Sequence, residues 1–253
     1  KDQIVNKDAV SMLVSLGIIE GKPDGSYGPT ENVDRAQMAK MLSVIMNKGV
    51  DNSALYQSVN SGLVDVNTNW AKGHINYCYT TGIIAGRGNG TFDPSATVTA
   101  LEAAKMLLVA VGYDPAIEGF EGADWAINVS VRADEQGIFE GFTKDLSAPL
   151  NRDDAALLIY NALDVEMIQS YTTNNYPIVY SDHRTILSDK YGVIKVEGVV
   201  TANEWAILDD DTDTALQEGK TRIYNPDGIL STTGNTAVAQ DSSANVKTQV
   251  FNV

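Results

Sequence analysis

The sequence is poor in basic residues, cysteine and long apolar runs, and each shortage excludes a class of protein. Its 18 lysine and arginine residues stand against 33 acidic residues, which gives a formal charge of −15. Nucleic acid and anionic membrane surfaces require a basic footprint, so neither is expected as a partner. Cys78 is the single cysteine, which excludes an internal disulfide and indicates a buried apolar residue. No run of about 18 apolar residues occurs, so no membrane span is expected.

The remaining composition is that of a globular protein, with 43% hydrophobic and 20% charged residues. A chain of 253 residues is long enough for one large domain or two smaller ones. Residues 1–168 hold 12 basic and 22 acidic residues, and residues 169–253 hold 6 and 11, so both parts are acidic.

A short glycine signal recurs three times. It reads GIIEG, GIIAG and GIFEG and begins at Gly17, Gly82 and Gly137. Trp70 and Trp125 each lie 12 residues before their glycine, and Val5 takes that place in the first copy. The matching offsets predict three tandem repeats at about residues 1–49, 63–113 and 120–168.

The repeats differ at one cationic position. Arg35 and Ala100 lie 18 residues after their glycines, and Arg152 lies 15 residues after its own because its loop is three residues shorter. The repeated unit therefore keeps an arginine in two copies and loses it in one.

Each repeat is predicted to form a helix, a loop and a longer helix. The recurring glycine stands where a helix C-terminus favours a left-handed residue, and the following PDG and GNG stretches are turn formers. Asp34, Thr99 and Asn151 directly precede helical runs and are good N-caps. One such hairpin cannot bury its apolar face alone, so the three are expected to pack against one another.

This unit resembles the S-layer homology (SLH) module, in which a helix ending in a GIIxG-like signal leads through a PDGxFxP-like loop to a T-R-A-E-like helix start. The matching helix starts here are VDRAQMAKM, VTALEAAKM and LNRDDAALL. The Trp-Ala openings at Trp70 and Trp125, and the LVDV before the first of them, also match. The resemblance covers roughly residues 1–168.

The resemblance implies an all-α pseudo-threefold bundle of three SLH repeats at 1–168. With the β-rich pattern of the residues after it, the chain is predicted to be α+β. It also implies a place on the bacterial cell surface, in the cell wall or S-layer. Grooves between adjacent repeats would bind a secondary cell-wall polysaccharide, often pyruvylated, or peptidoglycan decorated with a polyamine. No cofactor is implied.

Candidate ligand-binding residues follow from this resemblance and from the chemistry of a pyruvyl carboxylate. Arginine grips a carboxylate bidentately, and a helix start is expected to add free backbone N–H groups. Tryptophan can stack on a sugar face, and the second glycine of each signal would let a ligand approach closely. The candidates are Arg35, Arg152, Trp70, Trp125, Gly21, Gly86 and Gly141. The alternatives are a surface ion pair for the arginines, helix packing for the tryptophans, and cap or turn roles for the glycines.

From about residue 169 the helical period disappears, and 169–253 is predicted to be a β-rich domain or a fragment of a longer region. QSYTTNNYP is expected to begin a linker, GVIKVEGVVTANEWAIL to form two strands, and KTRIYN and VKTQVFNV further strands. STTGNTAVAQDSSAN is expected to be a loop. The acidic run DDDTD favours a solvated turn over a surface calcium site, for which Asp209, Asp211 and Asp213 are the candidate ligands.

The sequence therefore favours non-covalent cell-wall anchoring without chemistry of its own. The alternative is an S-layer lattice subunit whose β-rich domain mediates self-association. An envelope-glycan enzyme is the least favoured, because no nucleophile, metal or phosphate-binding motif is present.

Overall fold

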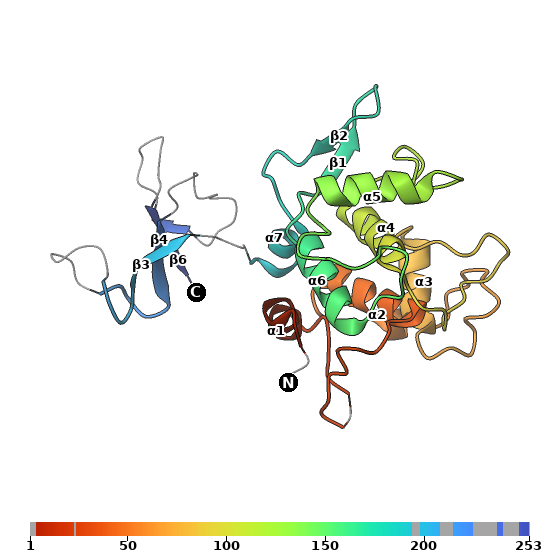
Figure 1. Ribbon diagram of the computed structural model, residues 1–253, viewed down its shortest axis with the longest axis horizontal. Coiled ribbons are helices and arrows are strands. Elements are labelled where there is room, and N and C mark those ends of the chain that lie inside the picture. The colour runs from red at the N-terminus through yellow and green to blue at the C-terminus, as the bar shows by residue number, and fades with distance from the viewer. Residues whose placement is uncertain are drawn as a thin grey trace. The chain divides into compact units, whose positions relative to one another are not determined.

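The computed structural model describes residues 4–22, 24–193, 198–207, 215–224, 237–239 and 248–252. The chain divides into two compact units, Lys1–Ser181 and Asp182–Val253, called here the N-terminal and C-terminal domains. The first is built mainly from helices and the second carries a small antiparallel sheet, so the α+β class is confirmed (Figure 1).

The N-terminal domain contains three short helices that alternate along the chain with three helices that follow the loops. The short ones are α1 (Lys7–Ser15), α3 (Lys72–Thr80) and α5 (Trp125–Glu135). The others are α2 (Arg35–Met46), α4 (Ala100–Val111) and α6 (Arg152–Ala162), and a 3₁₀ turn, η1 (Ser53–Tyr56), precedes α3. The expected order of helix, loop and longer helix holds in the first two predicted repeats, whereas α5 and α6 of the third both have 11 residues.

The local signals at the helix ends act as expected. Gly17, Gly82 and Gly137 have φ angles of 70°, 79° and 69°, the left-handed conformation that closes α1, α3 and α5. Each is followed by an isoleucine whose N–H donates to a carbonyl five residues back, as from Ile18 to Leu13 at 2.9 Å. The chain therefore leaves all three short helices in the same direction.

The helices beginning after the loops are capped by side chains at their starts. The side chains of Asp34, Thr99 and Asn151 accept hydrogen bonds from the backbone N–H three residues later, at 2.7, 3.2 and 2.8 Å. In α2 and α4 the side chain of the residue at that third position also accepts a hydrogen bond from the cap's own backbone N–H. The two bonds complete a capping box. All three predicted N-caps are confirmed.

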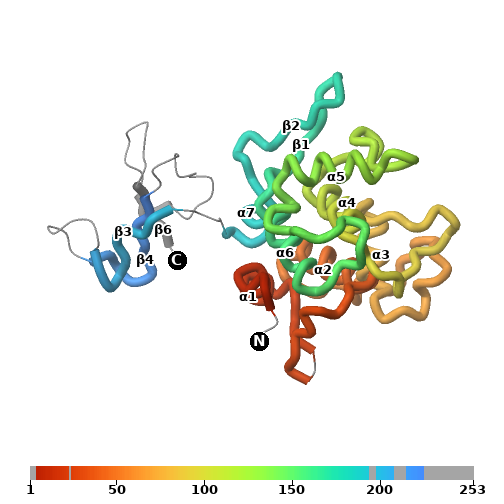
Figure 2. The backbone as a smooth tube through the Cα atoms, in the orientation of Figure 1, coloured from red at the N-terminus to blue at the C-terminus, as the bar shows by residue number. Residues whose placement is uncertain are grey.

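The helices pack across the predicted repeats. Helix α3 packs against α2, α5 against α4, and α1 against α6 (Figure 2). Each short helix thus covers the longer helix of the preceding copy, and the first short helix returns to the last long one. The apolar faces are buried by neighbours on the far side of a copy boundary.

Three backbone hydrogen bonds close a cycle where the capped helices begin. Val33 N–H donates to Leu150 O at 2.8 Å, Leu150 N–H to Val98 O at 2.8 Å, and Val98 N–H to Val33 O at 2.9 Å. The three side chains are buried. Residues far apart in sequence therefore meet at one point, and the cycle fixes the three helix starts relative to one another.

The short third loop lies in a register that its own proline does not mark. Ala36 N–H donates to Pro94 O, Asp153 N–H to Pro29 O, and Leu101 N–H to Leu146 O. Leu146, rather than the proline three residues later, therefore occupies the place of the two prolines. The helix start fixes this register because its N–H groups need a carbonyl at that position.

A β-hairpin follows α6, where the sequence analysis expected a linker. Strands β1 (Ile168–Tyr171) and β2 (Pro177–Val179) pair antiparallel. The Tyr171 hydroxyl donates to Glu118 Oε1 at 3.0 Å and accepts from Asp114 N–H at 2.9 Å, which ties the hairpin to the segment after α4. The structure thus divides after Ser181 and not after residue 168, because the hairpin belongs to the N-terminal domain.

The C-terminal domain holds α7 (Ile186–Tyr191) and a four-stranded antiparallel sheet of order β3-β4-β6-β5. Strands β3 (Val199–Asn203), β4 (Lys220–Tyr224) and β6 (Thr248–Asn252) lie in stretches predicted as strands. Strand β5 (Ala237–Ala239) lies in the stretch expected to be a loop, and α7 was not predicted. Part of the second predicted strand pairs as an isolated bridge from Ile207 to Ala202.

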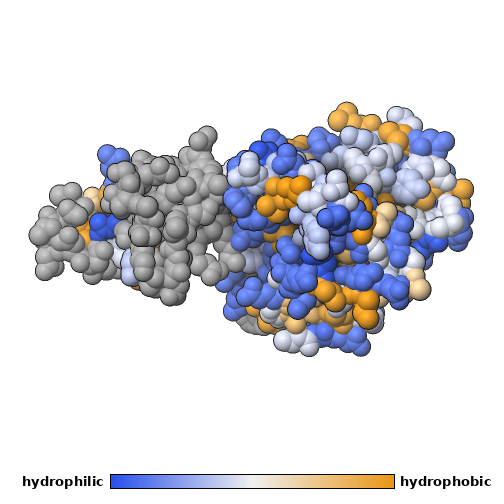
Figure 3. Space-filling view, turned by 90° about the horizontal axis from the view of Figure 1, so that it is seen from above, coloured by the Kyte–Doolittle hydropathy of each residue, from blue (hydrophilic) through white to orange (hydrophobic). Residues whose placement is uncertain are grey.

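Cys78 is fully buried, as expected, and burial raises the pKa of its thiol far above the usual value. The surface of the N-terminal domain in the view of Figure 3 is largely hydrophilic, with separate hydrophobic patches. Within the described ranges, every helix is too short or too polar to cross a lipid bilayer.

Candidate binding grooves

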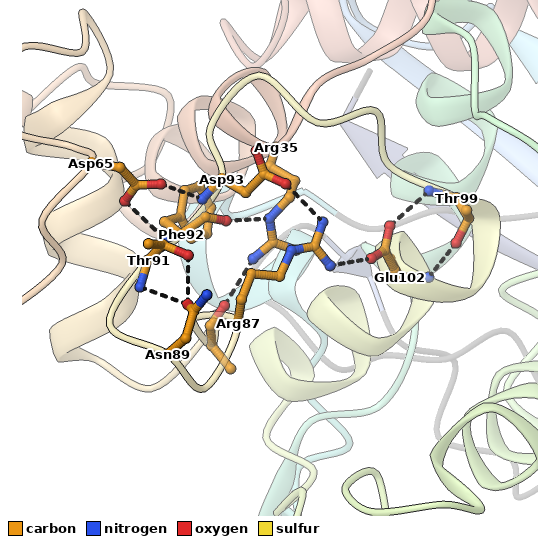
Figure 4. Close-up of polar contacts among 10 residues, drawn as sticks. Arg35, Asp65, Arg87, Asn89, Thr91, Phe92, Asp93, Thr99 and Glu102 are labelled. Atoms are coloured by element: carbon orange, nitrogen blue, oxygen red, sulfur yellow. Dashed lines mark hydrogen bonds and ion pairs between the residues drawn. The ribbon is translucent and has the colours of Figure 1, made fainter.

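Arg35 is almost fully buried at the start of α2, with 4% of its surface exposed. Its Nε donates to Phe92 O and its Nη2 to Ala85 O, both at 2.8 Å, so it bridges to the loop of the second predicted repeat. The guanidinium lies 4.3 Å from the centre of the Phe92 ring (Figure 4). Arg35 therefore holds the neighbouring loop in place.

Arg152 makes the same contacts with the loop of the first predicted repeat. Its Nε donates to Tyr27 O at 2.9 Å and its Nη2 to Glu20 O at 3.1 Å. The guanidinium lies 4.9 Å from the Tyr27 ring, and the Tyr27 hydroxyl donates to Arg152 O at 2.9 Å. The surface ion pair considered as an alternative is contradicted for Arg35, which is buried and whose guanidinium hydrogen-bonds to two loop carbonyls.

The helix starts do not offer the free backbone N–H groups that the sequence analysis expected, so that expectation is wrong. Arg35 N–H donates to Ala96 O and Arg152 N–H to Glu31 O, each at 2.9 Å. The next N–H in each helix is also bonded to a loop carbonyl. Protein groups already occupy the sites that an anion would need.

Ala100 is buried at the start of α4 and faces the third loop. By the register of Leu146, Lys144 stands where the other loops carry Tyr27 and Phe92. Lys144 pairs with Asp154 and is more than half exposed. An arginine thus begins the helix where the facing loop carries an aromatic residue. Where the loop has Lys144 in place of the aromatic residue, the helix begins with Ala100, which explains why this copy lacks the arginine.

Two grooves in the N-terminal domain are lined by corresponding residues. Groove 1 has a cavity volume of about 240 Å³ and lies along the loop at 18–22, with Lys40 of α2, Trp70 before α3, and Arg152. Groove 2 has a volume of about 540 Å³ and lies along 83–88, with Lys105 of α4, Trp125 of α5, and Arg35. Each groove therefore draws on all three predicted repeats.

The tryptophans present their rings at these grooves. Trp70 is 58% exposed and Trp125 is partly exposed, so neither side chain is fully buried in packing between helices. Lys105 Nζ lies 5.7 Å from the centre of the Trp125 ring and donates to Phe120 O. Trp125 therefore lies beside a cation, and Trp70 leaves more than half of its surface to solvent.

Groove 2 is lined by three cations, Arg35, Arg87 and Lys105, and by the carboxylates of Glu102 and Glu121. Burial and, to a smaller extent, the nearby charge of Arg87 lower the pKa of Arg35 to about 10, while Glu102 opposes the shift. Arg35 is still charged at neutral pH. Burial also lowers the pKa of Lys105, with Glu121 opposing and Arg35 adding to the shift.

The three candidate glycines have local structural roles. Gly21 and Gly86 line the two grooves, but each also opens a tight loop in which the next residue's N–H bonds to a carbonyl four residues on. A Cβ on Gly86 would lie 2.9 Å from Thr91 O. Gly141 has a φ of 74° and lines neither of these two grooves.

Gly86→Ala is expected to destabilise the N-terminal domain by about 1–3 kcal/mol, because the new methyl group meets backbone that cannot easily move. Gly21→Ala is the matched control, since its Cβ would lie at an ordinary 3.4 Å from Ser26 O. Urea unfolding followed by circular dichroism at 222 nm measures both. Equal stability of the two variants would contradict the steric argument.

Two kinds of groove residue were not predicted from the sequence. They are the lysines and the residues three positions after the helix caps. Lys40 and Lys105 lie six residues after the caps, and Gln37 and Glu102 lie three after them. The signal was present, since Ala-Lys-Met recurs at 39–41 and 104–106 and is absent from α6. Its position in the grooves could not be read from one copy, because each groove uses three.

The metal candidates Asp209, Asp211 and Asp213 lie outside the described residues. Among the residues that the structure does describe, no group of three or more histidine, cysteine or acidic side chains could hold a metal ion. The PDG and GNG turns are closed by their own side chains, with Asp24 accepting from Ser26 and Asn89 from Thr91.

Comparison with known families agrees with this architecture. The S-layer homology domain model matches residues 2–39 and 64–104, the stretches that build the loops of grooves 1 and 2. Both segments are S-layer homology sequence. The match includes Arg35, Trp70 and Ala100, and ends before Trp125 and Arg152.

The relatives that the chain resembles carry cell-surface names. A "Cell surface protein" of Thermoanaerobacter kivui is 29% identical over 92% of this chain, an "S-layer protein" of Bacillus licheniformis 33% over 45%, and a "Middle cell wall protein" of Brevibacillus brevis 29% over 63%. The chain spans 28%, 12% and 15% of their lengths. Together with the SLH segments, these matches assign the chain to the bacterial cell surface, in association with the cell wall.

Proposed function

We propose that this chain anchors a surface protein to the cell wall by binding a secondary cell-wall polysaccharide in grooves 1 and 2, without chemistry of its own. The observation that carries the proposal is the repeated lining. Each groove combines a tryptophan ring, a lysine on the capped helix and an arginine beneath the loop, from corresponding positions.

The lining suits an acidic carbohydrate. Tryptophan faces stack on the apolar faces of sugar rings, and lysine and arginine attract a carboxylate such as that of a pyruvyl ketal. A pyruvylated polysaccharide is therefore favoured over polyamine-decorated peptidoglycan, whose ammonium groups the groove cations would repel.

The proposal includes a pseudo-threefold bundle of three tandem SLH repeats with two working grooves. The closed hydrogen-bond cycle and the cyclic helix packing support the symmetry. The third surface that the symmetry would generate differs from grooves 1 and 2. There Val5, Leu157 and Ala100 stand in place of the tryptophan, the lysine and the arginine. That surface lacks the tryptophan, the lysine and the arginine of the other two.

Trp70→Ala and Trp125→Ala are expected to weaken binding to isolated cell-wall sacculi by about tenfold each, and by about 100-fold together, because each removes one stacking face. Cosedimentation at increasing sacculus concentration measures the loss. Both rings are substantially exposed, so the fold should persist, whereas removing Arg35 would disturb the fold itself.

Trp205→Ala is the matched control, since this tryptophan of the C-terminal domain is 83% exposed and lies in neither groove. Undiminished binding by the double groove variant would refute the proposal. A preference for de-pyruvylated or polyamine-bearing sacculi would refute the acidic ligand.

A second candidate function is that of an S-layer lattice subunit that self-associates through its C-terminal domain. Relatives named for S-layers favour it, as do the exposed Val199 and Val200 on β3, one of the two edge strands of the sheet. Ordered sheets of the purified chain in electron micrographs would support it, and a monomer at all concentrations would count against it.

A further inference from the structure

The two grooves differ at the third position after the helix cap. Groove 1 has Gln37 there and groove 2 has Glu102. Both side chains complete a capping box, because Gln37 Oε1 accepts from Asp34 N–H and Glu102 Oε2 accepts from Thr99 N–H, each at 3.1 Å. The two residues are thus equivalent in structure and differ in charge.

Glu102 uses its second oxygen inside groove 2. Its Oε1 accepts from Arg87 Nη1 at 3.0 Å, and Arg87 also lies 3.8 Å from Asp93 Oδ2 (Figure 4). Two carboxylates therefore already neutralise the cation that extends from the loop into groove 2. An incoming anion would have to compete with them.

Groove 1 has no carboxylate on the helix at the corresponding place. Its loop cation, Lys22, pairs with Glu31, which is half exposed and does not line the groove. Lys40 lies 3.4 Å from Glu20, whose side chain is 74% exposed. Screening by water weakens both pairs, so the groove 1 cations are freer to meet a ligand.

The balance of lining charges follows. Groove 1 presents Lys22, Lys40 and Arg152 against Glu20 alone. Groove 2 has three cations, Arg35, Arg87 and Lys105, and two carboxylates, Glu102 and Glu121. Its volume is more than twice that of groove 1.

We propose that the grooves divide the polymer between them, groove 1 selecting its carboxylate-bearing sugar and groove 2 taking neutral sugar residues, with Gln37 and Glu102 setting this preference. The proposal rests on the proposed function, because it assumes that both grooves hold saccharide. The Gln37 amide can donate a hydrogen bond to a ligand carboxylate, whereas the Glu102 carboxylate can only repel it.

The test exchanges the two residues, as Gln37→Glu and Glu102→Gln. Each substitution keeps the side-chain oxygen that accepts from the cap's N–H, so the capping box survives and the fold is controlled within the design. The probes are a hexoside bearing a 4,6-linked pyruvyl ketal and the same hexoside without it. A Trp125→Ala background isolates groove 1, and a Trp70→Ala background isolates groove 2.

In titration calorimetry at low salt, the groove 1 background is expected to prefer the pyruvylated probe, and the groove 2 background the neutral one. Gln37→Glu should weaken pyruvylated-probe binding about tenfold, and Glu102→Gln should strengthen it in groove 2 by roughly three- to tenfold. Neutral-probe affinity should change less than twofold in both.

Two outcomes overturn the inference. Equal charge preference in the two backgrounds would exclude a division of labour, and exchanges that leave the pyruvylated affinity unchanged would exclude Gln37 and Glu102 as its cause. The proposed function fails separately, if neither probe binds and the double tryptophan variant still cosediments with sacculi.

Discussion

Arg35→Met is expected to lower the free energy of unfolding of the N-terminal domain by about 3 kcal/mol. Methionine keeps the aliphatic volume and removes the guanidinium, so two loop carbonyls, Phe92 O and Ala85 O, lose their 2.8 Å donors. The contact with the Phe92 ring is lost as well, and such a desolvated cation–π contact contributes about 2 kcal/mol.

The measurement is urea unfolding followed at 222 nm, a signal that reports mainly on this domain because six of the seven α-helices in the described residues belong to it. Arg87→Met is the matched control in the same groove. Arg87 is 36% exposed at its side chain and makes only ion pairs, so a change under about 1 kcal/mol is expected. Equal losses in the two variants would contradict the bridging role of Arg35.

Arg35 and Arg152 hold loops of the grooves, so replacing them changes more than a ligand contact. Loss of wall binding after removal of both Arg35 and Arg152 would follow from displaced loops as readily as from a lost ligand contact. The exposed tryptophans separate these causes because their rings carry little of the core.

Local structure could be predicted from the sequence where neighbouring residues determine it. Caps such as Asp34 and left-handed glycines such as Gly17 act within one helical turn, so their types and positions are sufficient. The hydrophobic spacing gave the helices for the same reason. These features were confirmed in each predicted repeat.

What depends on another copy could not be predicted. The partner of Arg35 lies 57 residues away at Phe92, and the occupied helix-start N–H groups bond to loops of neighbouring copies. The offset of Leu146 is set by such a bond and not by its own sequence. The predicted arginines and tryptophans line the grooves, and the lysines there were missed. That these residues bind a ligand stays a prediction.

The hairpin and α7 were missed for another reason. Ile168–Tyr171 and Pro177–Val179 are too short and polar to show a strand period, and Tyr171 gains its place through Glu118 in the N-terminal domain. Tertiary contacts decide the structure of such short segments.

Asp153→Ala is expected to open the closure between α1 and α6 and to cost about 2–3 kcal/mol. Asp153 is 4% exposed, and its carboxylate accepts from the backbone N–H groups of Val5 and Asn6 at 3.2 and 3.3 Å and from Asn6 Nδ2 at 3.0 Å. The corresponding residues of α2 and α4 are Ala36 and Leu101, so the first helix alone is held in this way.

The loss should therefore be local. The amide hydrogen-exchange rates of α1 are expected to rise about 30-fold or more, which is the change in rate that corresponds to a loss of roughly 2 kcal/mol. The exchange rates of α3 and α5 should rise less. Asp134→Ala, an exposed change on α5, is the control and should shift stability by no more than about 0.5 kcal/mol. Unchanged protection of α1 in Asp153→Ala would show that apolar packing against α6 closes the ring of helices without this carboxylate. Groove 1 includes Arg152, the neighbour of Asp153, whereas groove 2 takes no lining residue from α1 or α6. Binding at groove 2 should therefore survive at temperatures where α1 exchanges freely, which would separate closure of the bundle from recognition of the wall.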